Sequence, residues 1–327
     1  MPLLPMVAIT GKRNSFISQA RISGVMVVSV LIDDAMVVIV PGLDWRGMRI
    51  GFKTSQTNVD WPTLKATWEL GDSLPVFDSG WIFDHFVALG GGGGSHEAFA
   101  LIGALAAVTN RLQLGHLVLG NTYRHPALVA KSGATIDHVS NGRFVLGLGA
   151  GWHEAEHEMF GMRLPPIGER ITMLDSAVRL IKALWESPSG VSLDAPPYEL
   201  RDAVCDPPPL TPGGPPIWLG GQGSRGLRIV AERADGWNQT GDPSTFVEKR
   251  DILLRHCEAV GRDPAEIEIS AQAFLRDGDH ASMLETAAGL AEAGAQHLIL
   301  IVPAADGPDG LQKLADRVAT PLRDRFA

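Results

Sequence analysis

The stretch HLILIV, residues 297–302, stays apolar from its second position onwards and does not alternate with polar residues. A strand with this pattern is buried on both faces, as in a parallel sheet that helices cover. Seven other runs of this kind precede it from Met48 onwards, and amphipathic stretches follow most of them. The predicted strands are residues 49–53, 79–84, 112–119, 143–149, 216–220, 236–239, 267–274 and 297–302.

Helical patterns lie between these strands. Apolar residues recur at spacings of three and four over residues 167–184 and predict an amphipathic helix. A second helix is predicted over residues 244–260, where Gly261 would end it. Eight strands, mostly followed by helices, predict an α/β fold, a (β/α)8 TIM barrel, in preference to a doubly wound sheet. The Pro-rich stretch 187–216 predicts an insertion between strands 4 and 5, with a short hairpin around Tyr198.

Residues 1–47 lack this rhythm and carry a net charge of +1, so the rest of the chain carries −10. Two apolar runs, 25–32 and 35–40, flank an acidic pair and predict a β-hairpin. Neither run reaches the roughly 20 residues of a membrane span, and the order of charges does not fit a secretory signal. We expect residues 1–47 to be an extension, in part poorly ordered, outside a functional domain of residues 48–327. Translation from an upstream start would explain it, and a chain beginning at Met48 should keep its fold.

The chain of 327 residues has 37 acidic and 28 basic residues, a formal net charge of −9. Binding of nucleic acid needs a basic face, and adhesion to an anionic membrane needs basic clusters, so we expect neither partner. Cys205 and Cys257 are too few for a disulfide framework and lack the spacing of metal ligands. A reduced, cytoplasmic protein is therefore expected.

The functional groups of a TIM barrel lie at the C-terminal ends of its strands. Asp84 and His85 end the second predicted strand, and His is the side chain most easily tuned to exchange a proton near neutral pH. The alternative is that Asp84 caps the next segment and His85 is an ordinary loop residue. Gly120 and Asn121 follow the third strand, where both can adopt backbone angles that let the chain turn over a ligand.

Two glycine-rich turns follow the fourth and fifth strands. Residues 147–152 read GLGAGW, and the missing side chains would let the backbone approach a planar or phosphorylated ligand. Residues 220–225 read GGQGSR before a predicted helix, whose N-terminal N–H groups favour an anion. Neither turn has the GxGxxG or GK[ST] pattern, and simple turns that pack helices are the alternative. The candidate ligand-binding residues of the two turns are Gly149, Ala150, Gly151, Gly220, Gly221, Gln222, Gly223 and Ser224.

Residues 153–157 read HEAEH and formally match the HExxH zinc motif. The match begins directly after a glycine turn, whereas zinc proteases carry the motif in the middle of a helix, and no third ligand follows downstream. We therefore expect no metal site.

Together, these strand-end motifs resemble the luciferase-like flavin and deazaflavin oxidoreductases, and they are most similar to the group that uses coenzyme F420. The resemblance is carried by residues 79–86 (SGWIFDHF), 114–126 (LGHLVLGNTYRHP), 141–152 (NGRFVLGLGAGW), Glu156, Gly161 and the Gly220-Gly221 turn. It runs from Met48 to about the C-terminus and does not include residues 1–47.

The resemblance implies a TIM barrel with an insertion and a cofactor ring at the C-terminal mouth of the barrel. It implies that a bulge in the third strand supports the ring, often with a non-proline cis peptide, for which Leu117–Val118 is the matching bond. It also implies that His85 acts as acid or base beside the reactive carbon, and that the two glycine-rich turns hold the phosphate and the tail. The cofactor-binding residues that it adds are Asp84, Leu117, Val118 and Asn121.

Trp152 departs from the pattern, because relatives that oxidise glucose 6-phosphate have a carboxylate at this position. The departure implies a more apolar pocket for a small organic substrate. The expected reaction is hydride transfer between coenzyme F420 and that substrate, with His85 handling a proton. The alternatives are an FMN-dependent monooxygenase on the same barrel and a cofactor-binding protein that has lost catalysis. Members of the family are often homodimers, so a homodimer is also implied.

Overall fold

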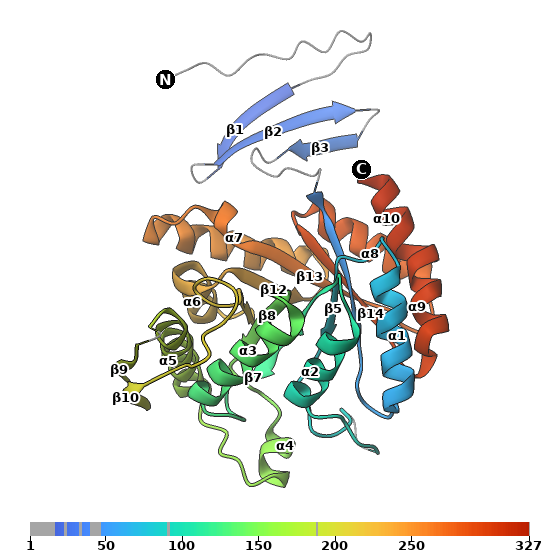
Figure 1. The fold of residues 1–327 in the computed structure, drawn as a ribbon. Coiled ribbons are helices and arrows are strands. Elements are labelled where there is room, and N and C mark those ends of the chain that lie inside the picture. Colours follow the sequence, from blue (N-terminus) through green and yellow to red (C-terminus); the bar gives the residue numbers. More distant parts are fainter. Residues whose placement is uncertain are drawn as a thin grey trace. The chain divides into compact units, whose positions relative to one another are not determined.

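The computed structural model of the chain describes residues 17–22, 25–32, 35–39, 47–89, 92–187 and 189–326. The chain divides into two compact units, residues 1–44 and 45–327. In the first unit, antiparallel pairing joins β1 to β2 and β2 to β3, which confirms the predicted hairpin (Figure 1). These strands are β1 (Ile17–Ile22), β2 (Val25–Ile32) and β3 (Ala35–Ile39). The rest of this segment, on which the expectation of poor order falls, lies outside the described residues.

Parallel strands of the second unit form a closed barrel in the part of the chain that the structure describes. Each strand pairs with the next around the ring, and the β14–β4 and β11–β8 pairings close it. The eight strands are β4 (Arg49–Thr54), β5 (Ser79–Ile82), β6 (Gln113–His116), β8 (Phe144–Gly149), β11 (Ile217–Gly220), β12 (Gly236–Thr240), β13 (Glu268–Phe274) and β14 (His297–Val302). The predicted TIM barrel is confirmed, and HLILIV is its last strand.

Helices surround the barrel on the outside (Figure 1). Asp60 and Asp242 accept hydrogen bonds from backbone N–H groups in the first turns of α1 and α7, and Gly261 ends α7 with a φ of 70°. These helices are α1 (Trp61–Ser73), α2 (Ala98–Val108), α3 (Pro126–Ser140), α5 (Ile167–Glu186), α6 (Ser224–Arg233), α7 (Pro243–Val260), α8 (His280–Glu292), α9 (Gly307–Leu314) and α10 (Thr320–Arg325). Among the described helices, none is long and apolar enough to cross a membrane.

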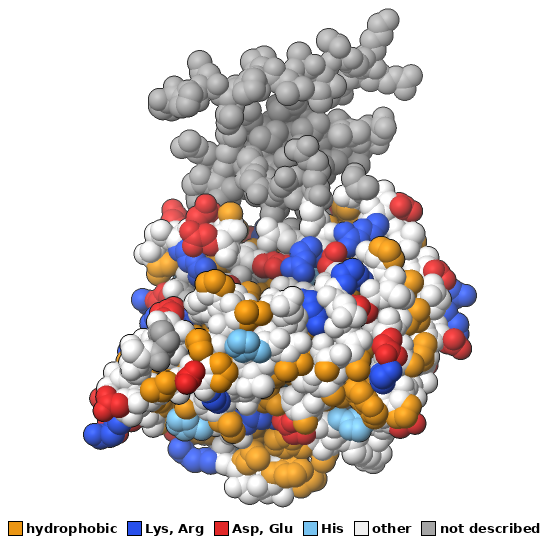
Figure 2. All heavy atoms as spheres, in the orientation of Figure 1, with side chains coloured by type: hydrophobic (Ala, Val, Ile, Leu, Met, Phe, Trp, Pro, Cys, Tyr) orange, Lys and Arg blue, Asp and Glu red, His pale blue; other side chains and the backbone are white. Residues whose placement is uncertain are grey.

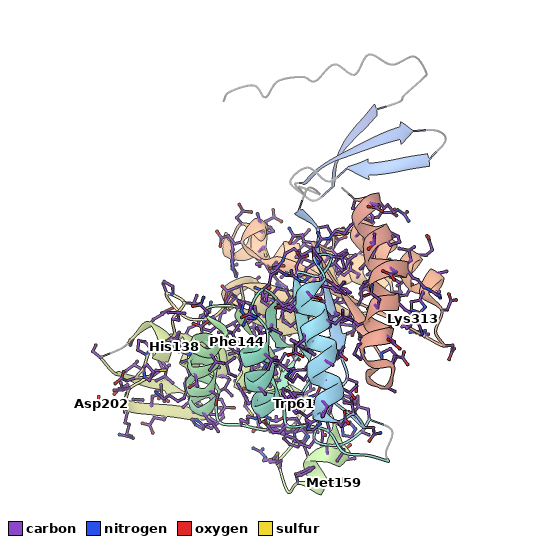
Figure 3. The ribbon with its side chains drawn as sticks, turned by 45° about the vertical axis from the view of Figure 1, so that its right-hand side comes forward. Trp61, His138, Phe144, Met159, Asp202 and Lys313 are labelled. Carbon is purple, nitrogen blue, oxygen red and sulfur yellow. The ribbon has the colours of Figure 1, made fainter. Side chains whose placement is uncertain are left out.

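Two excursions leave this regular pattern. The predicted insertion carries a hairpin of β9 (Val191–Ala195) and β10 (Tyr198–Ala203), as expected around Tyr198. The short helix α4 (Glu154–Met159) follows β8 at the C-terminal end of the barrel, and Figure 3 shows Met159 at the tip of this excursion. Hydrophobic side chains gather at the lower end of the face in Figure 2, where Figure 1 shows α4.

The third predicted strand is not continuous. It breaks after β6, and a two-residue strand, β7 (Leu119–Gly120), resumes the pairing with β8. Gly115 pairs with Val145 and Leu119 with Leu148, so four steps along this strand lie opposite three along β8. The extra residue makes a β-bulge that interrupts the ladder of hydrogen bonds, so the prediction of one strand was wrong.

Candidate functional site

The bulge between β6 and β7 presents the Leu117–Val118 peptide bond at the mouth of the barrel. This bond is cis, as the resemblance implied. Leu117 belongs to a buried cluster inside the barrel, and Val118 packs against that cluster. A Cβ on Gly149 would lie 2.7 Å from Val118 Cγ2, and one on Gly220 would lie 3.1 Å from Val118 Cγ1. These two glycines therefore make room for the bulge itself, a packing role that the sequence analysis did not foresee.

His85 follows β5 at the same end of the barrel. Its Nδ1 donates a hydrogen bond of 2.9 Å to Glu156 Oε2, and no described residue hydrogen-bonds to its Nε2. Three aromatic rings surround it, with centroid distances of 5.5 Å to Phe83, 5.6 Å to Trp152 and 5.6 Å to His153. The His85 side chain is 12% exposed, so bulk water reaches it poorly. A neutral imidazole held in this way keeps the Nε2 lone pair free to take a proton.

Glu156 is the buried carboxylate of α4 that orients His85. It also accepts hydrogen bonds from the N–H groups of Phe86 (2.5 Å) and Val87 (3.1 Å) and from the hydroxyl of Tyr123 (2.5 Å). Burial works to raise the pKa of Glu156, but the hydrogen bonds outweigh it and hold that pKa below its ordinary value. An ionised carboxylate that accepts a hydrogen bond from Nδ1–H fixes this tautomer of His85 and leaves the lone pair on Nε2. The sequence analysis gave Glu156 no role, because 71 residues separate it from His85.

Asp84 precedes His85 but is bound by other groups. Its carboxylate forms a bidentate ion pair with Arg124, at 2.7 and 2.9 Å, and accepts a hydrogen bond of 2.9 Å from the N–H of Gly120. Arg124 also pairs with Glu97. Burial works to lower the pKa of Arg124, but Asp84 and Glu97 outweigh it and raise that pKa. Asp84 therefore ties the segment after the bulge to the end of β5.

The residues after β7 and β8 lie against the insertion and α5. Asn121 is buried, and its side-chain amide donates to the hydroxyl of Tyr198 on β10 at 3.4 Å. Gly151 has a φ of 78°, which few side chains tolerate, and its carbonyl accepts a hydrogen bond from Arg170 of α5. Ala150 is partly buried and packs against the main hydrophobic core. Local packing therefore accounts for Ala150 and Gly151 of the first glycine-rich turn, in addition to any contact with a ligand at the barrel mouth.

The turn between β11 and α6 is open. A Cβ on Gly221 or Gly223 would meet no atom within 4 Å, and Gly221 has a φ of 134°. Gln222 Nε2 donates to a carbonyl at the end of β12 at 2.5 Å, and Ser224 begins α6. No side chain caps α6 among the described residues, so its first N–H groups are available to an anion. These features fit the phosphate of a cofactor.

The HEAEH segment has structural roles in α4. His153 is the N-cap, accepting a hydrogen bond of 3.1 Å from the N–H of Glu156. His157 Nε2 lies 2.7 Å from Thr122 Oγ1, and its Nδ1 donates to the carbonyl of His153 at 2.7 Å. Within the residues described, no three His, Cys, Asp or Glu side chains are grouped to hold a metal ion.

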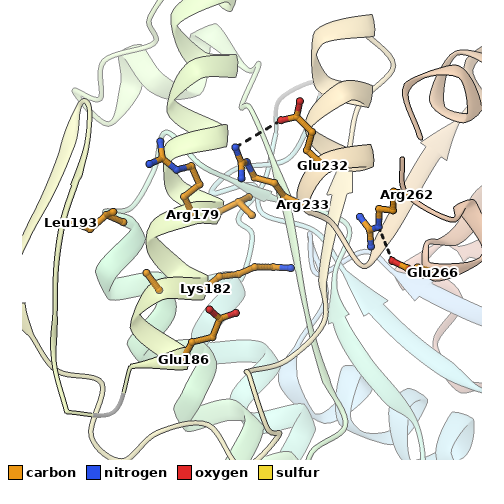
Figure 4. A pocket seen from close by; sticks show the side chains of 10 residues that line it. Arg179, Lys182, Glu186, Leu193, Glu232, Arg233, Arg262 and Glu266 are labelled. Atoms are coloured by element: carbon orange, nitrogen blue, oxygen red, sulfur yellow. Dashed lines mark hydrogen bonds and ion pairs between the residues drawn. The ribbon is translucent and has the colours of Figure 1, made fainter. Parts of the chain in front are cut away.

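A cavity of about 450 Å³ lies outside the barrel, between α5, α6 and β9 (Figure 4). Two ion pairs join side chains of its lining, Arg233 with Glu232 and Arg262 with Glu266. Its lining shares no residue with the groups around His85.

A family profile described as luciferase-like monooxygenase matches residues 73–317. The chain belongs to this family. The match includes β5 to β14, and therefore His85, Glu156, the bulge and both glycine-rich turns.

Curated relatives of this luciferase-like chain match it over different lengths. A phthiodiolone/phenolphthiodiolone dimycocerosates ketoreductase of Mycobacterium sp. (strain JLS) is 32% identical over 187 residues, which are 56% of this chain and 48% of that protein. The chain thus spans about half the length of this ketoreductase. An F420-dependent glucose-6-phosphate dehydrogenase of Kineococcus radiotolerans is 33% identical over 246 residues, 73% of this chain and 71% of that protein.

Solved structures share the luciferase-like fold at low identity. An F420-dependent secondary alcohol dehydrogenase in complex with an F420-acetone adduct has a TM-score of 0.70 and 20% identity, over 83% of this chain and 99% of that one. The monooxygenase RslO1 from Streptomyces bottropensis has a TM-score of 0.71 and 17% identity, over 86% of this chain and 100% of that one.

Proposed function

We propose that the chain is an F420-dependent oxidoreductase that transfers a hydride between the deazaflavin and a small, fairly apolar organic substrate. The observation that carries the proposal is that a buried, ionised Glu156 holds His85 through Nδ1 at the barrel mouth, while no described residue bonds to its Nε2. The dehydrogenase of Kineococcus radiotolerans, named as F420-dependent, supports the choice of coenzyme.

When bound, the coenzyme supplies a ring carbon that accepts or donates a hydride. His85 handles the accompanying proton. In the oxidative direction, a substrate hydroxyl gives its proton to Nε2 while the hydride leaves the adjacent carbon; in the reductive direction, Nε2–H returns the proton to the carbonyl oxygen. Glu156 holds the imidazole in place and stabilises the positive charge that it carries after taking the proton.

The remaining residues divide between coenzyme and substrate. The Leu117–Val118 bulge would support the ring, and the Gly220–Ser224 turn with the N-terminus of α6 would hold the phosphate. Trp152 is 64% exposed and lies edge-on to the ring of His85, so a substrate at Nε2 meets an indole instead of a carboxylate. This contact supports an apolar substrate.

Titration of the protein with F420 and, separately, with FMN tests the proposal through cofactor fluorescence. We expect F420 to bind at concentrations of tens of micromolar or below. Binding of FMN without binding of F420 would contradict the proposal and support an FMN-dependent monooxygenase.

Turnover of His85→Ala tests the role of His85 in the same preparation. We expect a large loss of turnover with retained binding of F420. Unchanged turnover would remove His85 from the mechanism.

A further inference from the structure

Lys53 is a cation inside the barrel that the sequence analysis did not single out. Gly51, two positions earlier on β4, faces the interior, because a Cβ there would lie 3.0 Å from Nε1 of the buried Trp81. Residues two apart on a strand face the same side, so the side chain of Lys53 also points into the barrel. Its Nζ lies 5.8 Å from the centroid of the Phe83 ring, which in turn neighbours His85.

The ammonium of Lys53 has two neutral hydrogen-bond acceptors. Nζ donates to the carbonyl oxygen of Leu117 at 2.9 Å and to Gln272 Oε1 at 2.9 Å. Gln272 in turn donates from Nε2 to Asn238, whose amide donates to Ser270 at 2.9 Å, so the side-chain acceptor of Lys53 belongs to a network of neutral groups. In the part of the chain that the structure describes, no carboxylate lies within ion-pair distance of Lys53.

The environment of Lys53 makes its charge costly. Burial lowers the pKa of Lys53 to about 8, and no anion opposes that shift. The side chain is therefore still mostly charged at pH 7. Lys53 keeps some solvent exposure, but a partly desolvated cation with no carboxylate partner among the described residues is still unfavourable in the free protein, and groups with a perturbed pKa concentrate at functional sites.

We propose that Lys53 supplies positive charge for the reduced deazaflavin, so that the chain binds reduced coenzyme more tightly, relative to oxidised coenzyme, than it would without that charge. The inference rests on the proposed function. Hydride transfer to the ring adds two electrons and one proton, which leaves one extra negative charge unless a second proton follows. The Leu117 carbonyl belongs to the bulge expected to support the ring, and Lys53 is bonded to that oxygen. A cation near an electron-rich cofactor ring tunes its electronics.

Two variants separate the charge of Lys53 from its hydrogen bonds. Lys53→Gln keeps an N–H donor and loses the charge, whereas Lys53→Arg keeps the charge. Arg49→Gln is the matched control, because Arg49 is a cation on the same strand that already has Glu268 as its partner. Dissociation constants of oxidised and reduced F420 are measured anaerobically through quenching of tryptophan fluorescence.

We expect Lys53→Gln to weaken binding of reduced F420 about tenfold or more beyond any change for oxidised F420, since one opposite charge nearby shifts an ionisation by about 1–3 pKa units. Lys53→Arg should retain most of the preference, and Arg49→Gln should leave it unchanged. Equal losses for both redox states in Lys53→Gln, or an unchanged preference, overturn the proposal.

If Lys53→Gln does not fold, the same dissociation constants are measured for Lys53→Met. The Met side chain has a similar length and needs no hydrogen-bond acceptor. Failure of the unaltered protein to bind either redox state would instead overturn the proposed function, and with it the role of Lys53.

Discussion

Apart from the Asp84–Arg124 ion pair at the C-terminal end, the two ends of the barrel differ in how their charged side chains are paired. At the N-terminal end, Glu268 Oε1 accepts hydrogen bonds of 2.8 Å from both Arg49 Nη1 and His297 Nδ1. The Glu268 carboxylate therefore has partners on two sides. At the C-terminal end, Lys53 has only neutral acceptors, and the carboxylate of Glu156 has no Lys or Arg partner among the described residues.

At the N-terminal end the charge of Glu268 is paired, and we call this the closed end. At the C-terminal end Lys53 and Glu156 lack partners of opposite charge among the described residues, apart from His85, and we call this the open end. Paired charges need nothing from outside and hold strands together, whereas unpaired charges favour a charge that arrives with the reaction. We have proposed that Glu156 stabilises the positive charge on His85 after proton transfer and that Lys53 stabilises negative charge on the coenzyme. This division matches the usual separation of function and stability between the two ends of a TIM barrel.

The largest effect is expected at the open end, for Glu156→Gln. The amide of Gln would donate to Nδ1 of His85, so the neutral imidazole would carry its proton on Nε2 and lose its basic lone pair. We expect kcat to fall roughly 10²- to 10⁴-fold, the usual contribution of a positioned acid or base, with little change in F420 affinity. Steady-state kinetics and a coenzyme titration measure both quantities.

Glu158→Gln is the matched control for this variant, because it removes the same charge from an exposed position of the same helix. Its kcat should stay within about twofold of the original, as for other surface substitutions. A Glu156→Gln protein with full activity and normal pH dependence would show that the open end does not work through His85.

An intermediate effect is expected at the closed end, for Glu268→Gln. Removing this anion leaves Arg49 and the buried His297 without their shared partner, and we expect a loss of about 1–3 kcal/mol in the free energy of unfolding. Affinity for F420 should not change. Glu266→Gln, which removes a more exposed ion pair with Arg262 from the same end, should cost less than about 1 kcal/mol. Urea unfolding measures both variants.

The effect of Glu268→Gln should depend on pH. Burial works to raise the pKa of Glu268, but His297 and Arg49 outweigh it and lower that pKa from its ordinary value of 4.5. The ionised carboxylate therefore stabilises the fold above pH 4.5, and this contribution is lost as pH falls through the lowered pKa. The gap in stability between the two proteins should be widest near neutral pH and close in acid. A gap that widens in acid would contradict the assignment of Glu268 as a stabilising anion.

The comparison also shows what the sequence could and could not predict. Strands such as HLILIV are recognisable because burial on both faces leaves a local apolar pattern. The bulge is not, since residues 112–119 carry no local pattern that marks it, and only the pairing with β8 shows the extra residue. The expected role of Leu117–Val118 came from resemblance to a family, not from its own pattern.

The contacts of the charged residues at the open end could not be predicted from local patterns either, because their partners are distant in sequence. Lys53 meets an acceptor 219 positions away in Gln272, and Glu156 meets His85 across 71 positions. The glycines at 149 and 220 suggested a ligand or a turn that packs a helix, and not room for Val118, because the side chain of Val118 comes from another strand.

The smallest effect is expected from removing residues 1–47, which we propose lie outside the functional domain. Met48 is the first described residue of the barrel whose side chain is buried, and its carbonyl accepts a hydrogen bond of 2.8 Å from Arg323. The N–H of Arg49 then donates to the carbonyl of Gln296 at 2.8 Å. A chain starting at Met48 should match the full chain within about 0.5 kcal/mol in unfolding free energy, as surface changes usually do, and bind F420 equally well. A chain starting at Phe52 is the control, because it lacks half of β4 and should not fold. Aggregation or loss of F420 binding in the chain from Met48 would show that the closed end is completed by residues before it.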